Sequence, residues 1–119
     1  MYGRILRKKI MGKLFYSPLA LQDMDGIWNY IFEELSNPTA ASNTVNRILD
    51  HIDRLRQFPE IGSPFSSVAK IETDYRYLVY GNYLAFYRSQ GEDIYIDRVL
   101  YGRRDYLKIL FGELPEENV

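Results

Sequence analysis

Hydrophobic residues recur at steps of three and four along residues 18–35 and again along 38–57. This spacing gathers apolar side chains on one side of an α-helix. The two apolar stripes consist of Met24, Ile27, Trp28, Ile31, Phe32 and Leu35, and of Ala41, Val45, Ile48, Ile52 and Leu55. Before each stripe stands a residue that can cap a helix, Ser17 or Asn37, followed by proline, which suits the first helical position. The short connector predicts an antiparallel helix hairpin.

From residue 75 onward the pattern changes to three strand-like runs, 75–80, 83–88 and 94–101. Only Gly81 and Asn82 separate the first two, which is a hairpin signal with glycine at the first turn position. Residues 59–71 read as a loop, and residues 13–17 form a fourth strand at the edge or centre of the sheet. We therefore predict an α+β fold in which the helix hairpin packs on one face of a four-stranded, mainly antiparallel sheet, followed by a short C-terminal helix.

Neither face of the predicted sheet is polar. Side chains alternate between the two faces of a strand, and aromatic or aliphatic residues fall on both faces of the first two meander strands. An antiparallel sheet with one solvated face normally shows a clean polar alternation. Two helices can cover only one face, so we expect the second face to be open, rich in tyrosine and fringed by arginine. Such a surface on a small protein usually belongs to a partner.

Composition excludes some classes of protein. The 119 residues contain no cysteine, which excludes a disulfide scaffold and thiolate metal or redox sites. The net charge of −1 gives no general indication of nucleic-acid binding. We divide the chain into a basic N-terminal extension (1–12), one domain (13–111) and an acidic tail (112–119), with Met11 as an alternative start. No segment resembles a signal peptide or a membrane span, so we expect a cytoplasmic protein.

Few residues suggest catalysis. The single histidine, His51, lies beside the second helical stripe and is more simply a helix-flank residue than a general base, and we expect no metal or cofactor. The acidic pairs of the first helix lack the spacing that would place them on one helix face. The arginines Arg76, Arg103 and Arg104 are better candidates, because guanidinium groups at converging strand ends suit an anionic partner. The structural alternative is a salt bridge, for example between Arg104 and Asp97 or Asp105.

The order of elements resembles the RelE/ParE superfamily of type II toxin–antitoxin toxins, and the ParE branch most closely. The segments that carry the resemblance lie between residues 13 and 110 and read SPLA at 17–20, IWNYI at 27–31, RLRQFPEIG at 54–62, YRYLV at 75–79, GNYLAFYR at 81–88 and VLYGRRD at 99–105. The resemblance implies a toxin neutralised by a cognate antitoxin that wraps across its helices and sheet. The antitoxin-binding residues that we expect are Tyr75, Tyr77, Tyr83 and Tyr87.

Members of the superfamily differ in the target that they act on. ParE-like members inhibit DNA gyrase by binding, and for that function we expect the target-binding residues to be Arg103, Arg104, Tyr106 and Lys108. RelE-like members cut mRNA on the ribosome, and the catalytic residues would then be Arg76, Arg104 and Tyr106. The lysine-rich strand of that branch is not matched by residues 70–74, and its C-terminal tyrosine falls near Leu110. Whether the protein is an enzyme therefore depends on the branch, and gyrase inhibition is the leading hypothesis.

Overall fold

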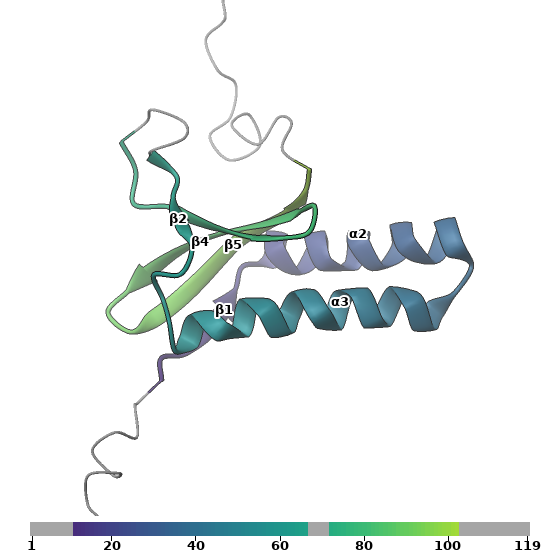
Figure 1. The fold of residues 1–119 in the computed structure, drawn as a ribbon, viewed down its shortest axis with the longest axis horizontal. Coiled ribbons are helices and arrows are strands. Elements are labelled where there is room, and N and C mark those ends of the chain that lie inside the picture. The colour runs from purple at the N-terminus through teal and green to yellow at the C-terminus, as the bar shows by residue number, and fades with distance from the viewer. Residues whose placement is uncertain (1–10, 67–71, 103–119) are drawn as a thin grey trace, which may run out of the picture.

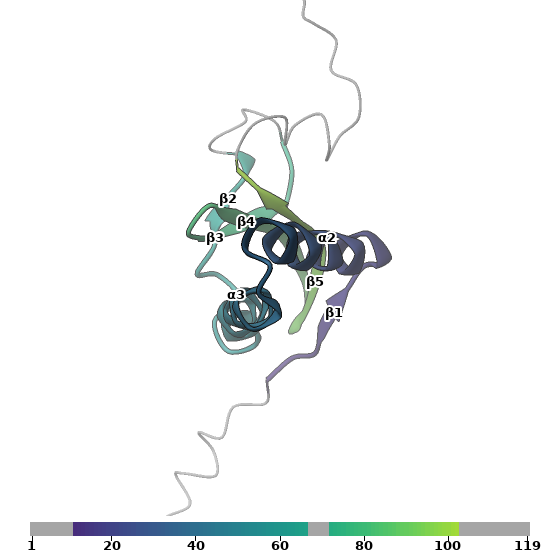
Figure 2. The same ribbon diagram turned by 90° about the vertical axis from the view of Figure 1, so that its right-hand side faces the viewer.

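The computed structural model describes residues 11–66 and 72–102. In chain order the elements are β1 (Leu14–Tyr16), α2 (Pro18–Leu35), α3 (Pro38–Asp53), the 3-10 helix η1 (Arg54–Arg56), β2 (Ser63–Pro64), β3 (Arg76–Tyr80), β4 (Tyr83–Gln90) and β5 (Asp93–Tyr101). The two long helices lie side by side on one face of the sheet and extend past its edge (Figures 1 and 2). The predicted α+β architecture is confirmed, while the predicted C-terminal helix lies outside the described residues.

Within the described residues the sheet has five strands in the order β1-β5-β4-β3-β2. The predicted meander is confirmed, since β3, β4 and β5 pair antiparallel. Residues 14–16 pair parallel with β5 at the edge of the sheet. The fifth strand, β2, was not predicted. It is a two-residue strand within the expected loop, and it pairs with Tyr77 and Arg76 of β3. Such a short pairing leaves no alternating pattern in the sequence, so periodicity could not find it.

The helix boundaries follow the capping residues. The Ser17 hydroxyl accepts a hydrogen bond from the Ala20 amide at 2.9 Å, and the Asn37 side chain accepts one from the Ala40 amide at 3.1 Å. At the hairpin turn between β3 and β4, Gly81 has a φ of +59°. Glycine adopts this conformation without a steric penalty, as the first position of a tight hairpin turn requires. Local sequence therefore determines where these elements begin and end.

The core lies between the helix hairpin and the sheet. Its buried members come from both layers and comprise Ala20, Met24, Ile27, Ile48, Ile52, Leu55, Leu78, Ala85, Tyr87, Ile94, Ile96 and Val99. The pairing of Tyr80 with Tyr83 and of Leu78 with Ala85 sets which side chains face the helices. This register places Tyr83 and Tyr87 on the helix side of the sheet. Tyr77 lies on the opposite face, so the predicted antitoxin-binding tyrosines do not form one surface.

An irregularity in β5 fixes α2 to the sheet. The pairing between β4 and β5 shifts between Phe86 and Tyr87, so that Asp97 has no partner residue on β4. Beyond this shift β5 extends past the end of β1. Hydrogen-bond partners for the backbone of this exposed edge come from α2. The Asp23 carboxylate accepts two hydrogen bonds from the Arg98 guanidinium, both at 2.8 Å, and one from the Val99 amide at 2.9 Å. The sequence analysis assigned no structural role to Asp23, because its partners lie 75 residues away.

We expect Asp23→Ala to lower the free energy of unfolding by about 2–4 kcal/mol, because it leaves a largely buried guanidinium without its partner. The Asp23 and Arg98 side chains are only 13% and 21% exposed. Urea denaturation measures the change. Asp25→Ala is the matched control, since Asp25 lies on the same helix but is exposed, and a change there should stay within about 0.5 kcal/mol. Equal unfolding free energies for the two variants would show that the pair contributes nothing.

Candidate functional site

An apolar groove lies between α2 and the ends of β4 and β5. It is lined by Gly26, Ile27, Tyr30, Tyr83 and Tyr101 and encloses about 350 Å³. The rings of Tyr83 and Tyr101 meet edge to face with centroids 5.3 Å apart. Burial, followed by the neighbouring Tyr101 and Tyr30, raises the pKa of Tyr83. A cavity of this size and character can accept apolar side chains of a partner.

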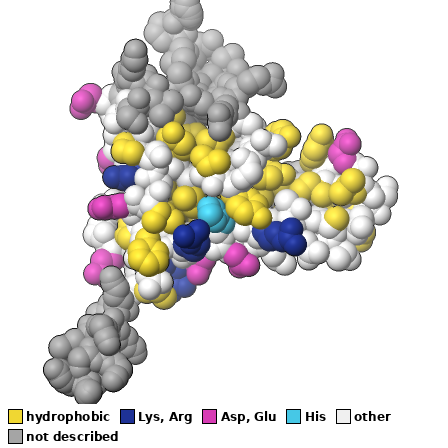
Figure 3. All heavy atoms as spheres, in the orientation of Figure 1, with side chains coloured by type: hydrophobic (Ala, Val, Ile, Leu, Met, Phe, Trp, Pro, Cys, Tyr) yellow, Lys and Arg dark blue, Asp and Glu magenta, His cyan; other side chains and the backbone are white. Residues whose placement is uncertain are grey.

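Other exposed apolar residues lie on α2 itself. Figure 3 shows hydrophobic side chains where the helix hairpin meets the sheet and along α2 toward the tip of the hairpin. Trp28 and Phe32 stack with ring centroids 5.3 Å apart, and the Trp28 indole donates to the Ser42 hydroxyl at 3.1 Å. Phe32 remains 39% exposed and Leu35 60% exposed. The helix hairpin thus presents apolar surface beyond the edge of the sheet.

The second face of the sheet is not open at its centre, as the sequence analysis expected. Phe65, which follows β2, packs edge to face against Phe86 with centroids 5.4 Å apart and against Tyr77 with centroids 6.3 Å apart. Phe65 and Phe86 are each only 1% exposed, and Leu84 is 4% exposed. The loop residue Phe65 forms a second, smaller core there. The expectation of an uncovered tyrosine-rich face is therefore wrong for the centre of the sheet.

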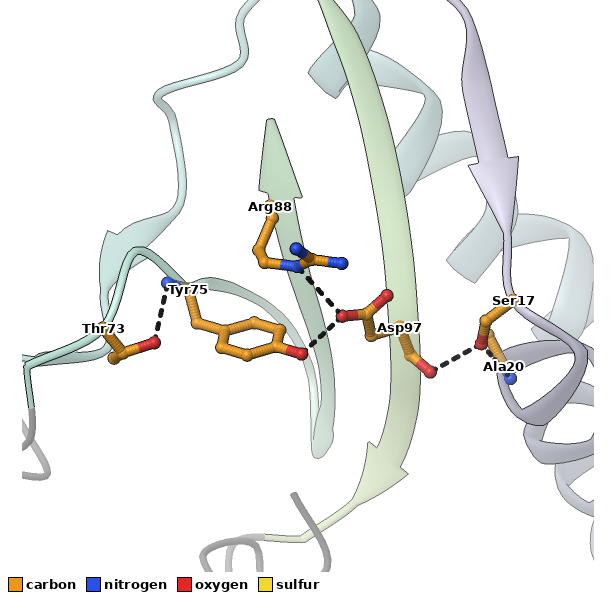
Figure 4. A network of polar contacts seen from close by, with 6 residues as sticks. All are labelled: Ser17, Ala20, Thr73, Tyr75, Arg88 and Asp97. Carbon is orange, nitrogen blue, oxygen red and sulfur yellow. Dashed lines mark hydrogen bonds and ion pairs between the residues drawn. The ribbon is translucent and has the colours of Figure 1, made fainter. Parts of the chain in front are cut away.

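Tyr75, Arg88 and Asp97 form a polar network on this second face (Figure 4). The Tyr75 hydroxyl donates to the Asp97 carboxylate at 2.5 Å, and Arg88 Nε donates to the same oxygen at 3.2 Å. The Arg88 guanidinium also lies 5.5 Å from the centre of the Tyr75 ring. From the other side of β5, the Ser17 hydroxyl donates to the Asp97 carbonyl at 2.8 Å. Asp97 therefore joins three parts of the chain. The alternative salt bridge between Asp97 and Arg104 involves a residue outside the described ones.

Tyr87 holds the segment that follows η1. Its ring is fully buried, and its hydroxyl donates to the Pro59 carbonyl at 2.7 Å and accepts from the Gly62 amide at 3.1 Å. Arg76 donates to the Gly62 carbonyl at 2.6 Å. A Cβ atom added to Gly62 would lie 2.5 Å from the Tyr87 hydroxyl oxygen, so only glycine fits. We call these four residues, Pro59, Gly62, Arg76 and Tyr87, the loop clamp.

The predicted site residues thus have separate environments. Tyr83 lines the apolar groove, Tyr75 belongs to the polar network, and Tyr77 packs against Phe65. Tyr87, which has no exposed surface, belongs to the loop clamp together with Arg76. The remaining predicted residues, Arg103, Arg104, Tyr106 and Lys108, lie outside the described residues.

His51 lies beside an aromatic ring and an arginine. The His51 ring lies against Tyr80 with centroids 5.1 Å apart, and its Nδ1 is 3.5 Å from an Arg54 nitrogen. Within residues 11–66 and 72–102 there is no cluster of three or more histidine or acidic residues that could hold a metal ion. No helix in these ranges is long and apolar enough to cross a membrane.

The sequence analysis missed the groove residues on α2. Gly26 and Tyr30 lie off the apolar stripe, and Tyr30 entered only as part of the IWNYI segment of the family resemblance. A glycine in the middle of an otherwise strong helical pattern is a recognised signal of a packing or functional constraint. Tyr101 was predicted as part of a strand and of the VLYGRRD segment, without a role in binding. The groove exists because the end of β5 lies beside α2, and the spacing of residues along the chain does not reveal that juxtaposition.

Residues 14–106 match the family model described as the ParE toxin of the type II toxin–antitoxin system, parDE. The match covers most of the chain, including the helix hairpin and all three meander strands. The chain belongs to the ParE toxin family. A comparison with curated protein sequences gives no match.

Two solved structures share the ParE-type fold. The chain is 24% identical to a chain of the chromosomal ParDE TA system from P. aeruginosa, with a TM-score of 0.65 over 78% of this chain and 98% of that chain. It is 17% identical to a chain of the toxin–antitoxin complex RelBE2 from Mycobacterium tuberculosis, with a TM-score of 0.50 over 79% of this chain and 94% of that chain. At these identities the likeness establishes the fold alone.

We expect Tyr87→Phe to destabilise the protein by about 1–3 kcal/mol, because it leaves the Gly62 amide and the Pro59 carbonyl without their buried partner. Hydrogen exchange at the Gly62 amide should accelerate, and urea denaturation should show the loss of stability. Tyr77→Phe is the control, since Tyr77 is also half-buried or more on the same hairpin but packs through its ring. If both variants unfold at the same urea concentration as the original protein, the loop clamp has no energetic role.

Stability at high pH should report on Tyr75. Burial, and then the hydrogen bond to Asp97 and its charge, raise the pKa of the Tyr75 phenol to about 12 from 10. The folded state therefore favours the neutral phenol, and this contribution is complete below pH 10 and is lost as the pH rises through 12. Tyr75→Phe should make the decline of the unfolding free energy between pH 10 and pH 12 less steep. An unaltered slope in Tyr75→Phe would contradict the assignment.

Proposed function

We propose that this protein is the toxin of a type II toxin–antitoxin pair, that it inhibits DNA gyrase in the cytoplasm, and that a cognate antitoxin neutralises it. The match of residues 14–106 to the ParE toxin family carries this proposal. The matched region includes Arg103, Arg104 and Tyr106, which the sequence analysis assigned to target binding. Inhibition by binding needs a complementary surface and no complete set of catalytic groups.

The contacts of the described arginines support binding over RNA cleavage. A ribonuclease needs cationic groups free to stabilise a phosphorane and groups that move protons. Arg76, one of the three candidates for that chemistry, donates to the Gly62 carbonyl and lies beside Tyr87 in the loop clamp. Arg88 pairs with Asp97, and Arg98 pairs with Asp23. These guanidinium groups have structural partners, which leaves the basic segment after Gly102 as the better candidate for contact with the target.

The distribution of charge also favours a separate, basic target-binding segment. The described residues contain seven Lys and Arg residues against twelve Asp and Glu residues. Residues 103–108 contribute Arg103, Arg104 and Lys108 against Asp105. Fixed guanidinium groups on this segment suit carboxylates or phosphates of a macromolecular target. The antitoxin would meet the acidic body and its exposed apolar residues.

Replacing both Arg103 and Arg104 by alanine should abolish growth inhibition while the fold and antitoxin binding persist. Expression of the original protein without antitoxin should arrest growth and increase gyrase-linked DNA breaks, and the double variant should do neither. Replacing arginines that act only in target binding should change the unfolding free energy by no more than about 0.5 kcal/mol. Loss of toxicity together with early melting would assign the pair a structural role.

A supercoiling assay with purified gyrase tests the target directly. Increasing amounts of the protein should inhibit supercoiling, and normal supercoiling in its excess would refute gyrase as the target. Primer extension on translated messages then identifies the other branch of the superfamily. Cuts within codons at the ribosomal A site would establish the RelE-like activity in place of gyrase inhibition.

A further inference from the structure

Gly12 fixes the point at which the N-terminal extension meets the folded domain. A Cβ atom added to Gly12 would overlap the Glu92 carbonyl, so only glycine fits against the turn between β4 and β5. The Gly12 carbonyl also accepts a hydrogen bond from Arg56 Nε at 3.2 Å. The chain therefore enters the fold beside η1, and Figure 1 shows the start of the described chain next to the end of α3.

A shallow pocket lies directly after η1, and we call it the η1 pocket. It encloses about 330 Å³ and is lined by Gln57, Phe58, Pro59, Glu60 and Ile61. Phe58 is 50% exposed and Ile61 is 41% exposed, so the pocket presents apolar side chains on the surface of the described structure. Gln57 follows the arginine that binds the Gly12 carbonyl. The η1 pocket is therefore adjacent to the point where the extension meets the fold.

Hydrogen bonds of the backbone hold the η1 pocket in shape. The Phe58 amide donates to the Arg54 carbonyl at 2.9 Å, and the Ile61 amide donates to the Phe58 carbonyl at 3.2 Å. The loop clamp secures the same segment, since the Tyr87 hydroxyl donates to the Pro59 carbonyl. These bonds use backbone groups of the pocket and leave the apolar side chains exposed. A surface fixed in this way binds a segment with a smaller loss of conformational entropy.

Acidic side chains flank the η1 pocket and the entry point of the chain. Glu60 lines the pocket, Glu92 lies against Gly12, and Asp53 is 3.4 Å from an Arg56 nitrogen. All three carboxylates belong to exposed residues. Residues 1–10 contain four cationic residues and no acidic one, namely Arg4, Arg7, Lys8 and Lys9. The charge of the extension is therefore complementary to that of the surface beside it.

The extension also has apolar residues within reach of the η1 pocket. Its apolar side chains are Tyr2, Ile5, Leu6 and Ile10. A chain spans at most about 3.6 Å per residue, so Ile10 lies within about 7 Å of Gly12 and Leu6 within about 22 Å. A tether this short keeps the segment at a local concentration on the order of millimolar beside the pocket. Weak apolar and ionic contacts are sufficient for docking at such a concentration.

We propose that the η1 pocket is the docking site of the chain's own N-terminal extension. Ile10 and Leu6 pack against Phe58 and Ile61, and the basic side chains of the extension face the surrounding carboxylates. The family match begins at residue 14, so the docked segment lies outside the matched region. The docking is independent of the proposed function, because it involves neither an antitoxin nor a target. A chain that starts at Met11 lacks the segment and leaves the pocket open.

A double-mutant cycle in the full chain tests the apolar contact. Ile10→Ala and Phe58→Ala should each lower the melting temperature by about 3–5 °C. The double variant should melt no earlier than the less stable single variant, because both changes remove the same contact. Leu35→Ala is the matched control, since Leu35 is a 60% exposed apolar residue at the end of α2. Its effect should add to that of Ile10→Ala.

A spin label locates the extension directly. The chain contains no cysteine, so Gly3→Cys can be labelled with a nitroxide at a single position. The label should broaden the amide NMR signals of residues 57–62 more than that of Gly91, whose turn also lies beside Gly12. Glu60→Lys should reduce this difference, because it reverses a charge of the pocket. Glu33→Lys makes the same change at an exposed position on α2 and should leave the difference unaltered.

Two results would overturn the docking of the extension. The first is equal broadening at residues 57–62 and at Gly91, or melting temperatures that add in the Ile10→Ala and Phe58→Ala cycle. The second is broadening that passes from a spin-labelled copy to an isotope-labelled copy in a mixed sample, since the pocket would then bind the extension of a second molecule. Circular dichroism of each variant establishes that the fold is retained.

Discussion

The edge of β5 is the feature on which the arrangement of the two layers depends. At the pairing shift beside Asp97, β5 leaves its regular register with β4, and β1 ends one residue before α2 begins. Backbone groups at a sheet edge need hydrogen-bond partners. Ser17 and Asp23 supply them from the start of α2, and Asp23 also neutralises Arg98. The first helix is therefore positioned by polar contacts in addition to the packing of its apolar face.

This frame leaves apolar side chains of the helix hairpin exposed. The loop clamp and Phe65 secure the long connection between η1 and β3 on opposite faces of the sheet. Within the described residues, five of the eleven exposed large apolar side chains lie on α2 and a sixth, Tyr101, lies at the end of β5. Recognition surfaces on a fixed scaffold bind with a smaller loss of conformational entropy than surfaces that must first become ordered.

Much of the fold could be predicted because it is encoded locally. The caps at Ser17 and Asn37, the apolar stripes and the Gly81 turn act over a few residues, and each element appears where the pattern places it. The predicted tyrosine site, by contrast, does not form one surface in the structure. The tyrosines of one strand alternate between the two faces of the sheet, and the cross-strand register decides which face lies toward the helices. Phe65 covers part of the other face, and it comes from a loop whose sequence has no periodicity.

The sequence by itself determined the helices, the meander and the family resemblance, because these depend on spacing and on short motifs. Only the tertiary structure decided that Asp23 binds Arg98, that Tyr87 is buried beneath the segment around Gly62, and that Gly26 faces an open groove. Each of these contacts joins residues far apart in the chain, or depends on what a folded neighbour leaves uncovered. Local propensity carries no information about such distances, because they arise only when the two layers pack.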